Sequence, residues 1–88
     1  MPTLKVKVRF LSYLADILGI KESVIEIPGG TTLGEALEII KNLWPEIRKI
    51  DREGEGPIIT LLNGFTAKLD TKIREEDEIA ILPPATGG

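Results

Sequence analysis

Apolar and charged residues alternate strictly near the start of the chain. Apolar side chains occupy every second position of residues 4–10, and basic side chains occupy the positions between them. Because successive side chains of a strand point to opposite faces, this pattern predicts a strand with one buried face. The buried face carries Leu4, Val6, Val8 and Phe10, and the outer face carries Lys5, Lys7 and Arg9. Continuing the alternation places Leu11 on the outer face.

A short helix and a second strand are predicted next. Ser12 is a suitable N-cap, and Gly19 can end the helix in the left-handed conformation. The apolar side of this helix carries Leu14, Ile17 and Leu18. Alternation over residues 23–28 predicts a strand that Gly29-Gly30 ends, with Ile25 and Ile27 facing inward.

The main helix is predicted to begin at a capping box formed by Thr32 and Glu35. It ends near Pro45, which disfavours helical geometry in the preceding residue. One stripe of this helix carries Leu33, Ala36, Leu37, Ile40, Leu43 and Trp44, and we interpret Trp44 as a packing residue. Residues 45–57 are predicted to form a loop, with at most one helical turn around Ile47 and Ile50.

The last third of the chain predicts strands separated by turns. Residues 58–62 form a nearly continuous apolar run, which predicts a central strand with both sides at least partly covered. Asn63-Gly64 marks a turn, after which residues 65–69 return as a short strand. A polar connection over 70–77 holds one apolar anchor, Ile73. The final strand, 78–82, places Ile79 and Ile81 on one face and Ala80 and Leu82 on the other.

This order of elements predicts an α+β fold with one main helix on one face of a sheet. Periodicity alone fits both a β-grasp roll and a ferredoxin-like sandwich. At 88 residues the chain forms one domain, which we place at residues 1–82, followed by a flexible tail at 83–88.

Composition narrows the functional classes. The chain contains no Cys and no His, so the thiolate nucleophile, the imidazole base and the usual zinc ligands are all missing. An enzyme with catalytic side chains of its own is therefore disfavoured. The net charge of −3 disfavours nucleic acid as a partner. The sequence has neither an apolar run of about 20 residues nor a signal peptide, which favours a cytoplasmic protein that does not bind membranes.

The tail carries the strongest candidate chemistry. Pro83-Pro84 stiffens the exit from the last strand, and Gly87-Gly88 closes the printed sequence. Six extended residues reach about 20 Å, enough to enter a partner's active site. Glycine has no Cβ, so it can pass through a channel too narrow for other residues. A terminal carboxylate is ionised at neutral pH and can therefore act as a nucleophile. The candidate reacting group is therefore the carboxylate of Gly88. Contacts to the partner's channel are expected from Gly87 and from Pro83, Pro84, Ala85 and Thr86.

A second candidate feature is an apolar cluster on the outer face. Leu11, Ala80 and Leu82 share this face by alternation, and Phe65 can join them. An outward apolar cluster next to the tail suggests a docking patch, although a short helix or loop can also cover such residues. The basic strip of the first strand fits a solvated sheet face better than a steering surface.

The sequence resembles a known family at these same positions. The run from Asp77 to Gly88 is similar to the C-terminus of the small subunit of molybdopterin synthase (MoaD) and related ThiS-like sulfur carriers, and Leu62-Asn63-Gly64 matches the preceding strand and turn. The resemblance implies a β-grasp, ubiquitin-like fold with no bound cofactor or metal. It also implies that an E1-like enzyme uses ATP to adenylate Gly88, which becomes a thiocarboxylate. The large synthase subunit would then pass the sulfur to a pterin.

Three functions remain open at this stage. The first is a sulfur carrier for molybdopterin or tungstopterin synthesis. The second is a ubiquitin-like protein modifier, or a carrier for tRNA thiolation, which uses the same activation but a different acceptor. The third is a binding module whose tail is inert.

Overall fold

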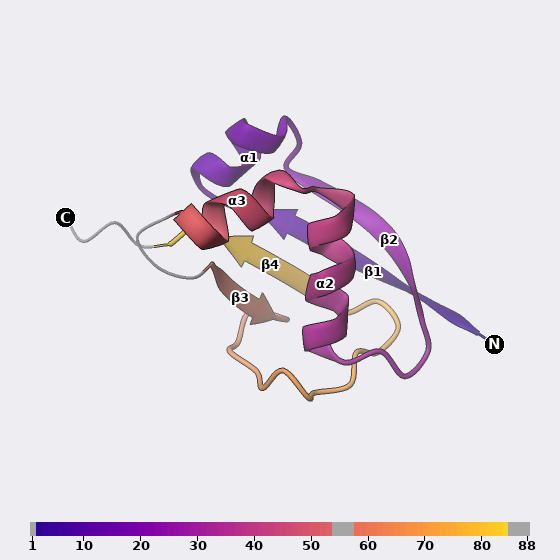
Figure 1. The fold of residues 1–88 in the computed structure, drawn as a ribbon. Helices are drawn as coiled ribbons and strands as arrows, with labels where there is room; N and C mark the ends of the chain where they lie inside the picture. The colour runs from indigo at the N-terminus through magenta and orange to yellow at the C-terminus, as the bar shows by residue number, and fades with distance from the viewer. Residues whose placement is uncertain (1, 54–57, 85–88) are drawn as a thin grey trace.

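The computed structural model describes residues 2–53 and 58–84. The strands and helices follow one another along the chain in the order β-α-β-α-α-β-β (Figure 1). The elements are β1 (Thr3–Phe10), α1 (Tyr13–Leu18), β2 (Glu22–Pro28), α2 (Leu33–Leu43), α3 (Glu46–Glu53), β3 (Ile59–Leu62) and β4 (Glu78–Leu82). No helix of this part of the chain is long and apolar enough to cross a membrane.

The strands form one mixed sheet in the order β2-β1-β4-β3. β1 pairs with β2 antiparallel and with β4 parallel, and β3 pairs with β4 antiparallel. A ferredoxin-like fold is built from split βαβ units, in which another strand lies between the first two strands of the unit. Here β2 lies directly beside β1. The topology therefore confirms the β-grasp and excludes the ferredoxin-like alternative.

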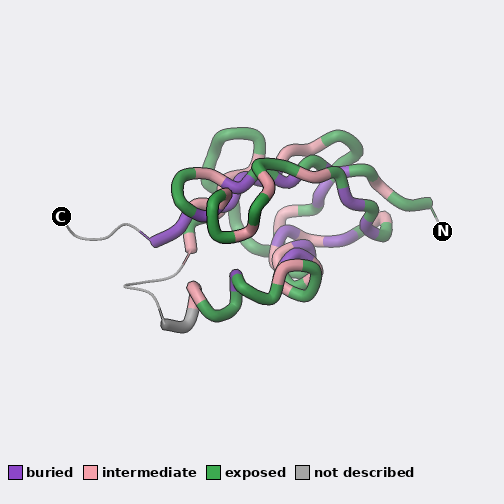
Figure 2. The backbone as a smooth tube through the Cα atoms, turned by 90° about the horizontal axis from the view of Figure 1, so that it is seen from above, coloured by how far each residue is buried: buried purple, intermediate pink, exposed green. Residues whose placement is uncertain are grey.

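The core lies between the sheet and the helices α2 and α3, which cover the same face (Figure 1). Buried residues follow the strands and the helix sides that face them (Figure 2). The largest fully buried side chains are Phe10, Leu14, Ile27, Leu33, Ile40, Ile47, Ile79 and Ile81. Trp44 packs edge-on against Phe10 with ring centroids 4.9 Å apart, which confirms its packing role.

α2 begins at the predicted capping box. The Thr32 hydroxyl accepts a hydrogen bond from the Glu35 N–H at 3.2 Å, and the Glu35 carboxylate accepts one from the Thr32 N–H at 2.9 Å. The Thr32 hydroxyl also donates to the Glu35 carboxylate at 3.1 Å. The backbone N–H and the hydroxyl of Thr32 together lower the pKa of Glu35 below its usual value, because both bonds favour the charged carboxylate. The expected apolar stripe is correct except for Leu43, which is 53% exposed at the end of the helix.

The segment after Pro45 differs from the predicted loop. α3 forms two turns there, and Ile47 is fully buried against the core. The Arg48 guanidinium also ties α3 to α2 by hydrogen bonds to Glu38 and Asn42. The predicted single turn around Ile47 and Ile50 was too short, because these two residues are the apolar positions of α3 and the other six are charged.

Two expectations for the last third are also corrected. β3 is an edge strand rather than a central one. Residues 65–69 form no strand, and Phe65 makes only an isolated bridge to Leu62. The Ile73 anchor is confirmed, since this side chain is buried in the core. At α1, Gly19 adopts the expected left-handed cap, but the Ser12 side chain makes no capping hydrogen bond.

Candidate docking face and tail

The face of the sheet opposite α2 and α3 carries an apolar cluster at the end of β4. The backbone N–H of Leu11 donates to the Ile81 carbonyl at 3.0 Å, which places Leu11 beside Leu82. On the other side of β4, Ile59 lies opposite Leu82 and Leu61 lies opposite Ala80. Directly opposite residues of paired strands share a face, so these side chains form one cluster. We call it the open-face patch: Leu11, Ile59, Leu61, Ala80 and Leu82.

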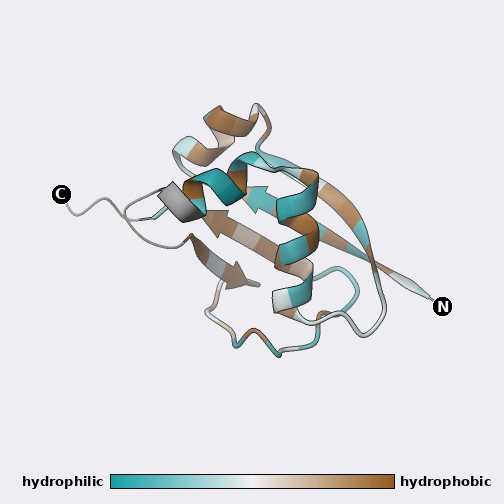
Figure 3. Cartoon of the chain, viewed as in Figure 1, coloured by the Kyte–Doolittle hydropathy of each residue, from teal (hydrophilic) through white to brown (hydrophobic). Residues whose placement is uncertain are grey.

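The members of the open-face patch differ in exposure. Ile59 is 40% exposed, and Leu11, Leu61 and Leu82 are half-buried. Ala80 is only 7% exposed, because this small side chain lies between larger neighbours on a central strand. β3 and β4 are hydrophobic along most of their length (Figure 3). The patch therefore offers a partner mainly leucine and isoleucine side chains.

The structure brings together three of the sequence-predicted residues, Leu11, Ala80 and Leu82, but not Phe65. Phe65 pairs with Leu62, which lies opposite Ile79, three positions along β3 from the Ile59–Leu82 pair. At about 3.3 Å per residue, this places Phe65 roughly 10 Å from Leu82 along the sheet. Phe65 is 77% exposed there and belongs to the opposite end of the sheet.

Sequence reasoning missed Ile59 and Leu61 as members of the patch. The apolar run 58–62 predicts a central strand with both sides at least partly covered, whereas β3 lies at the edge. An edge strand whose outer face remains apolar gives the same sequence signal as a buried central strand. The sequence does not show that β3 pairs with β4. Once that pairing is known, the alternation within β4 places Ile59 and Leu61 on the same face as Leu82 and Ala80.

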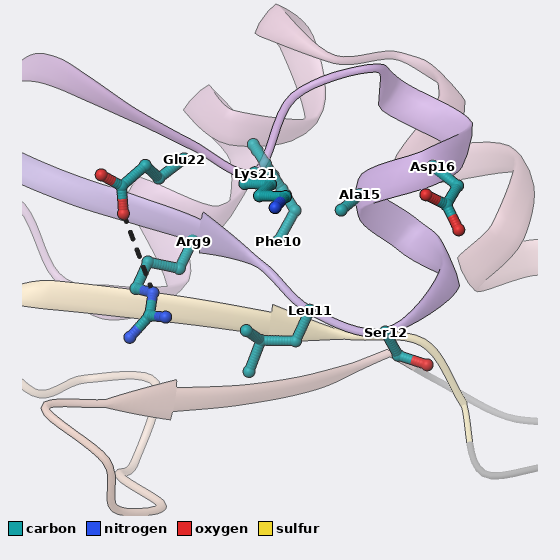
Figure 4. A pocket seen from close by; sticks show the side chains of 8 residues that line it. All are labelled: Arg9, Phe10, Leu11, Ser12, Ala15, Asp16, Lys21 and Glu22. Atoms are coloured by element: carbon teal, nitrogen blue, oxygen red, sulfur yellow. Dashed lines mark ion pairs between the residues drawn. The ribbon is translucent and has the colours of Figure 1, made fainter.

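A shallow hollow of about 560 Å³ borders the open-face patch (Figure 4). Its walls come from the end of β1, the start of β2 and the helix α1. Arg9 and Leu11 project to the same side in this view, and the Arg9 Nε lies 3.9 Å from a Glu22 carboxylate oxygen. A second carboxylate, on Glu78, lies 3.4 Å from the Arg9 Nη1. The hollow thus continues the apolar patch into a rim of mixed charge.

Asp51 joins the end of α3 to the start of β3, close to where β4 ends. One carboxylate oxygen accepts the backbone N–H of Ile58 at 2.9 Å, and the other accepts the Lys41 ammonium at 3.1 Å. Burial alone would raise the pKa of Asp51, but the Ile58 hydrogen bond and the Lys41 charge lower it below its usual value. Ile59 follows Ile58 directly, so this polar clamp holds one side of the open-face patch in place.

Replacing Asp51 with Asn is expected to lower the free energy of unfolding by about 1–2 kcal/mol at pH 7, because the charge-assisted bond to Lys41 is lost. The folded-state pKa of Asp51 lies below its unfolded value of about 3.9, so this stabilisation is complete above that value. It disappears as the pH falls through the folded pKa. Urea denaturation of both proteins should therefore give a stability difference that shrinks below about pH 4. A difference that persists unchanged into stronger acid would contradict the clamp.

The predicted tail begins where β4 ends. Pro83 and Pro84 are both buried, so these two residues lie against the folded body. Ala85, Thr86, Gly87 and Gly88 lie outside the described residues. Within the described part of the chain, no group of His, Cys, Asp or Glu side chains is arranged to hold a metal ion.

The sheet order, the helices on one face and the apolar patch beside the end of the last strand define a ubiquitin-like β-grasp domain. The sequence matches the ThiS family over residues 8–88, so the chain belongs to this family. Small archaeal modifier protein 1 of Haloferax volcanii is 33% identical over 79 residues, which cover 85% of this chain and 91% of that protein.

Two solved structures show the same fold. A putative molybdopterin converting factor subunit 1 from Pyrococcus furiosus superposes with a TM-score of 0.80 at 22% identity, covering 93% of this chain and 99% of that one. A chain of the complex of molybdopterin-converting factor subunits 1 and 2 from Helicobacter pylori gives a TM-score of 0.62 at 26% identity, covering 97% and 100%. The chain is thus similar in sequence to a protein named as a modifier, and similar in fold to proteins named as converting-factor subunits.

Proposed function

We propose that this protein is a sulfur carrier whose reacting group is the C-terminal carboxylate of Gly88. The observation that carries the proposal is the match to the ThiS family, which extends through Gly87-Gly88. The open-face patch at the end of β4 supports it, because the patch lies beside the strand from which the tail emerges. The described residues offer no competing cluster of His, Cys, Asp or Glu for metal chemistry.

The proposed chemistry has two balanced steps. A carboxylate oxygen of Gly88 attacks the α-phosphorus of ATP, pyrophosphate leaves, and a mixed anhydride with AMP forms. A sulfide-level sulfur donor then attacks the acyl carbon and AMP leaves, which gives a thiocarboxylate. An E1-like partner supplies the ATP site and the donor, since this chain provides no thiol of its own. The carrier itself contributes the carboxylate, an unhindered approach and a docking surface.

The proposed recipient of the sulfur is a pterin in the active site of a molybdopterin synthase large subunit, for synthesis of a molybdenum or tungsten cofactor. The Helicobacter pylori complex supports this, since there a protein of the same fold assembles with subunit 2. We assign the open-face patch to docking with both the activating enzyme and the large subunit. Because the same surface serves both, the carrier would bind them in turn rather than together.

A second candidate is a ubiquitin-like modifier, and the similarity to small archaeal modifier protein 1 favours it. Here the acyl-adenylate is passed on until a lysine amine attacks the acyl carbon, which yields an amide instead of a thiocarboxylate. Activation and docking are the same in both cases. ATP–pyrophosphate exchange with a purified E1-like enzyme from the same host tests their shared step. Exchange that depends on this chain supports both, and a chain that never stimulates exchange rules out both.

Gly87→Val tests the narrow channel. A β-branched side chain directly before the reacting carboxylate should block entry, so the rate of pyrophosphate exchange is expected to fall by at least about 100-fold. The thermal midpoint should stay unchanged because the substitution lies beyond β4. Thr86→Val is the matched control, since it adds no bulk at the glycine position. A Gly87→Val protein that is adenylated at the normal rate would show that the channel does not select for glycine.

A further inference from the structure

β2 is an exposed edge strand with unused backbone hydrogen-bonding groups. The Phe10 N–H donates to the Lys21 carbonyl at 2.8 Å and the Gly29 N–H donates to the Pro2 carbonyl at 3.0 Å, so these pairs bracket the β1–β2 ladder. Hydrogen-bonded and non-bonded pairs alternate along an antiparallel ladder. The N–H and C=O groups of Ser23, Ile25 and Ile27 therefore point toward β1. Those of Glu22, Val24 and Glu26 point away from the sheet.

Nothing else in the described chain pairs with this outer edge. β2 is the outermost strand on its side of the sheet (Figure 1). Val24 is 62% exposed, and Glu22 and Glu26 on either side of it are exposed as well. β3, the opposite edge, is shorter and partly occupied, since Asp51 takes the Ile58 N–H and Phe65 pairs with Leu62. β2 is therefore the edge at which an added strand can form hydrogen bonds.

The side chains of β2 decide what kind of strand can be added. A second copy pairing antiparallel about Val24 would place Glu22 of each chain opposite Glu26 of the other. Like charges directly opposite each other destabilise a strand pair, so this edge disfavours self-association. A strand with basic side chains opposite Glu22 and Glu26 makes two favourable cross-strand pairs instead, in which Glu22 is shared with Arg9, 3.9 Å away, and Glu26 with Lys5, its register partner on β1.

A hollow beside Val24 adds a place for an apolar side chain. It has a volume of about 370 Å³ and is lined by Lys5, Val6, Lys7, Val24 and Glu76. Val24 lies opposite Lys7 in the β1–β2 register, so the hollow lies on the same outer face as the three outward side chains of β2. A leucine opposite Val24 in an added strand could lean over Val24 into it. Backbone pairing with pockets for alternate side chains is how strand addition achieves specificity.

We propose that the β2 edge binds an extended segment of a partner protein with a basic–apolar–basic pattern at alternate positions. The segment continues the sheet beyond β2, its basic side chains meet Glu22 and Glu26, and its apolar side chain covers Val24. β2 is separated from β4 by β1, a distance of about 10 Å. A partner held at this edge leaves the open-face patch and the tail accessible. The inference goes beyond the proposed function and does not depend on Gly88.

The test uses the full chain and a synthetic peptide with Lys, Leu and Arg at alternate positions separated by threonines. In an NMR titration, the amide signals of Glu22, Val24 and Glu26 should shift and their hydrogen exchange should slow. A peptide with Glu at both basic positions should bind at least about tenfold more weakly. No shift at about 1 mM peptide, or shifts centred on Leu11 and Leu82, would overturn the proposal.

Val24→Pro removes one outward N–H without breaking a bond to β1, so the variant should fold normally. The Kd of this variant for the basic peptide should be about tenfold higher, which matches the net contribution of one lost hydrogen bond to the binding free energy. Val24→Thr keeps the N–H and the strand-forming shape, so it should retain most of the binding that Val24→Pro loses. Glu22→Gln combined with Glu26→Gln should weaken binding and reduce its salt dependence. A folded Val24→Pro protein that binds at full strength would refute strand addition at this edge, and self-association through Val24 would refute a basic segment as the partner.

Discussion

Deleting Gly87 and Gly88 is expected to abolish activation by the E1-like partner while leaving the thermal midpoint within about 1 °C of the full chain. The pairs of β4 with β1 and β3 end at Phe10–Ile81 and Ile59–Leu82, so the deletion removes no strand pairing. The reaction, in contrast, loses both the carboxylate at the correct reach and the unhindered approach to it. Differential scanning calorimetry and ATP–pyrophosphate exchange on the same two proteins measure the two halves of this prediction.

The control for the deletion is Lys68→Ala, which removes an exposed side chain outside the tail and the open-face patch. It should be activated at close to the normal rate. A truncated chain that still acquires sulfur would show that Gly88 is not the reacting group. A truncated chain that melts several degrees lower would show that the last two residues belong to the folded body.

Leu82→Glu is expected to weaken binding to both the activating enzyme and the large synthase subunit by about 10- to 150-fold. Burying a leucine side chain in an interface contributes about 1.5–3 kcal/mol, and the substitution also places an unpaired carboxylate there. Leu82 lies on the open face beside Leu11 and opposite Ile59, so folding should be affected far less than binding. Isothermal titration and thermal melting of the variant separate these effects.

Leu69→Glu is the matched control for Leu82→Glu. Leu69 is 62% exposed and lies in the connection between Phe65 and Ile73, outside the open-face patch. Its substitution introduces the same charge and should leave partner binding unchanged. If Leu82→Glu instead lowers the free energy of unfolding by several kcal/mol, Leu82 belongs to the core. If it folds and binds both partners normally, the open-face patch has no role in docking.

The strongly periodic elements could be predicted from the sequence. Inward-facing and outward-facing residues alternate along β1, β2 and β4, and α2 combines a capping box with an apolar stripe. In these elements the local sequence pattern agrees with the burial in the fold. Only one turn of α3 could be predicted, because Ile47 and Ile50 are its two apolar residues. The full length of this charged helix depends on the contacts of Ile47 with distant parts of the chain. The edge position of β3 was hidden because Ile59 and Leu61 are apolar on a face that no helix of the described chain covers.

The candidate site was predicted unevenly. Alternation within β1 and β4 was enough to place Leu11, Ala80 and Leu82 on one face, because successive side chains of a strand point to opposite faces of the sheet. It could not show that Ala80 would be nearly buried, since that depends on the larger side chains around it. Phe65 was misplaced because the turn at Asn63-Gly64 reverses the chain at the far end of β3, away from Leu82.

The central claim is that the carboxylate of Gly88 carries sulfur, and intact-mass spectrometry of the protein purified from its native host tests it most directly. The account predicts a fraction of the chain that is heavier than the unmodified protein by the difference between one sulfur and one oxygen atom. Fragmentation should place this difference on Gly88, and a mild alkylating reagent should react there. A chain found only with an unmodified carboxylate, or only joined to lysines of other proteins, or extending beyond Gly88, would contradict the account.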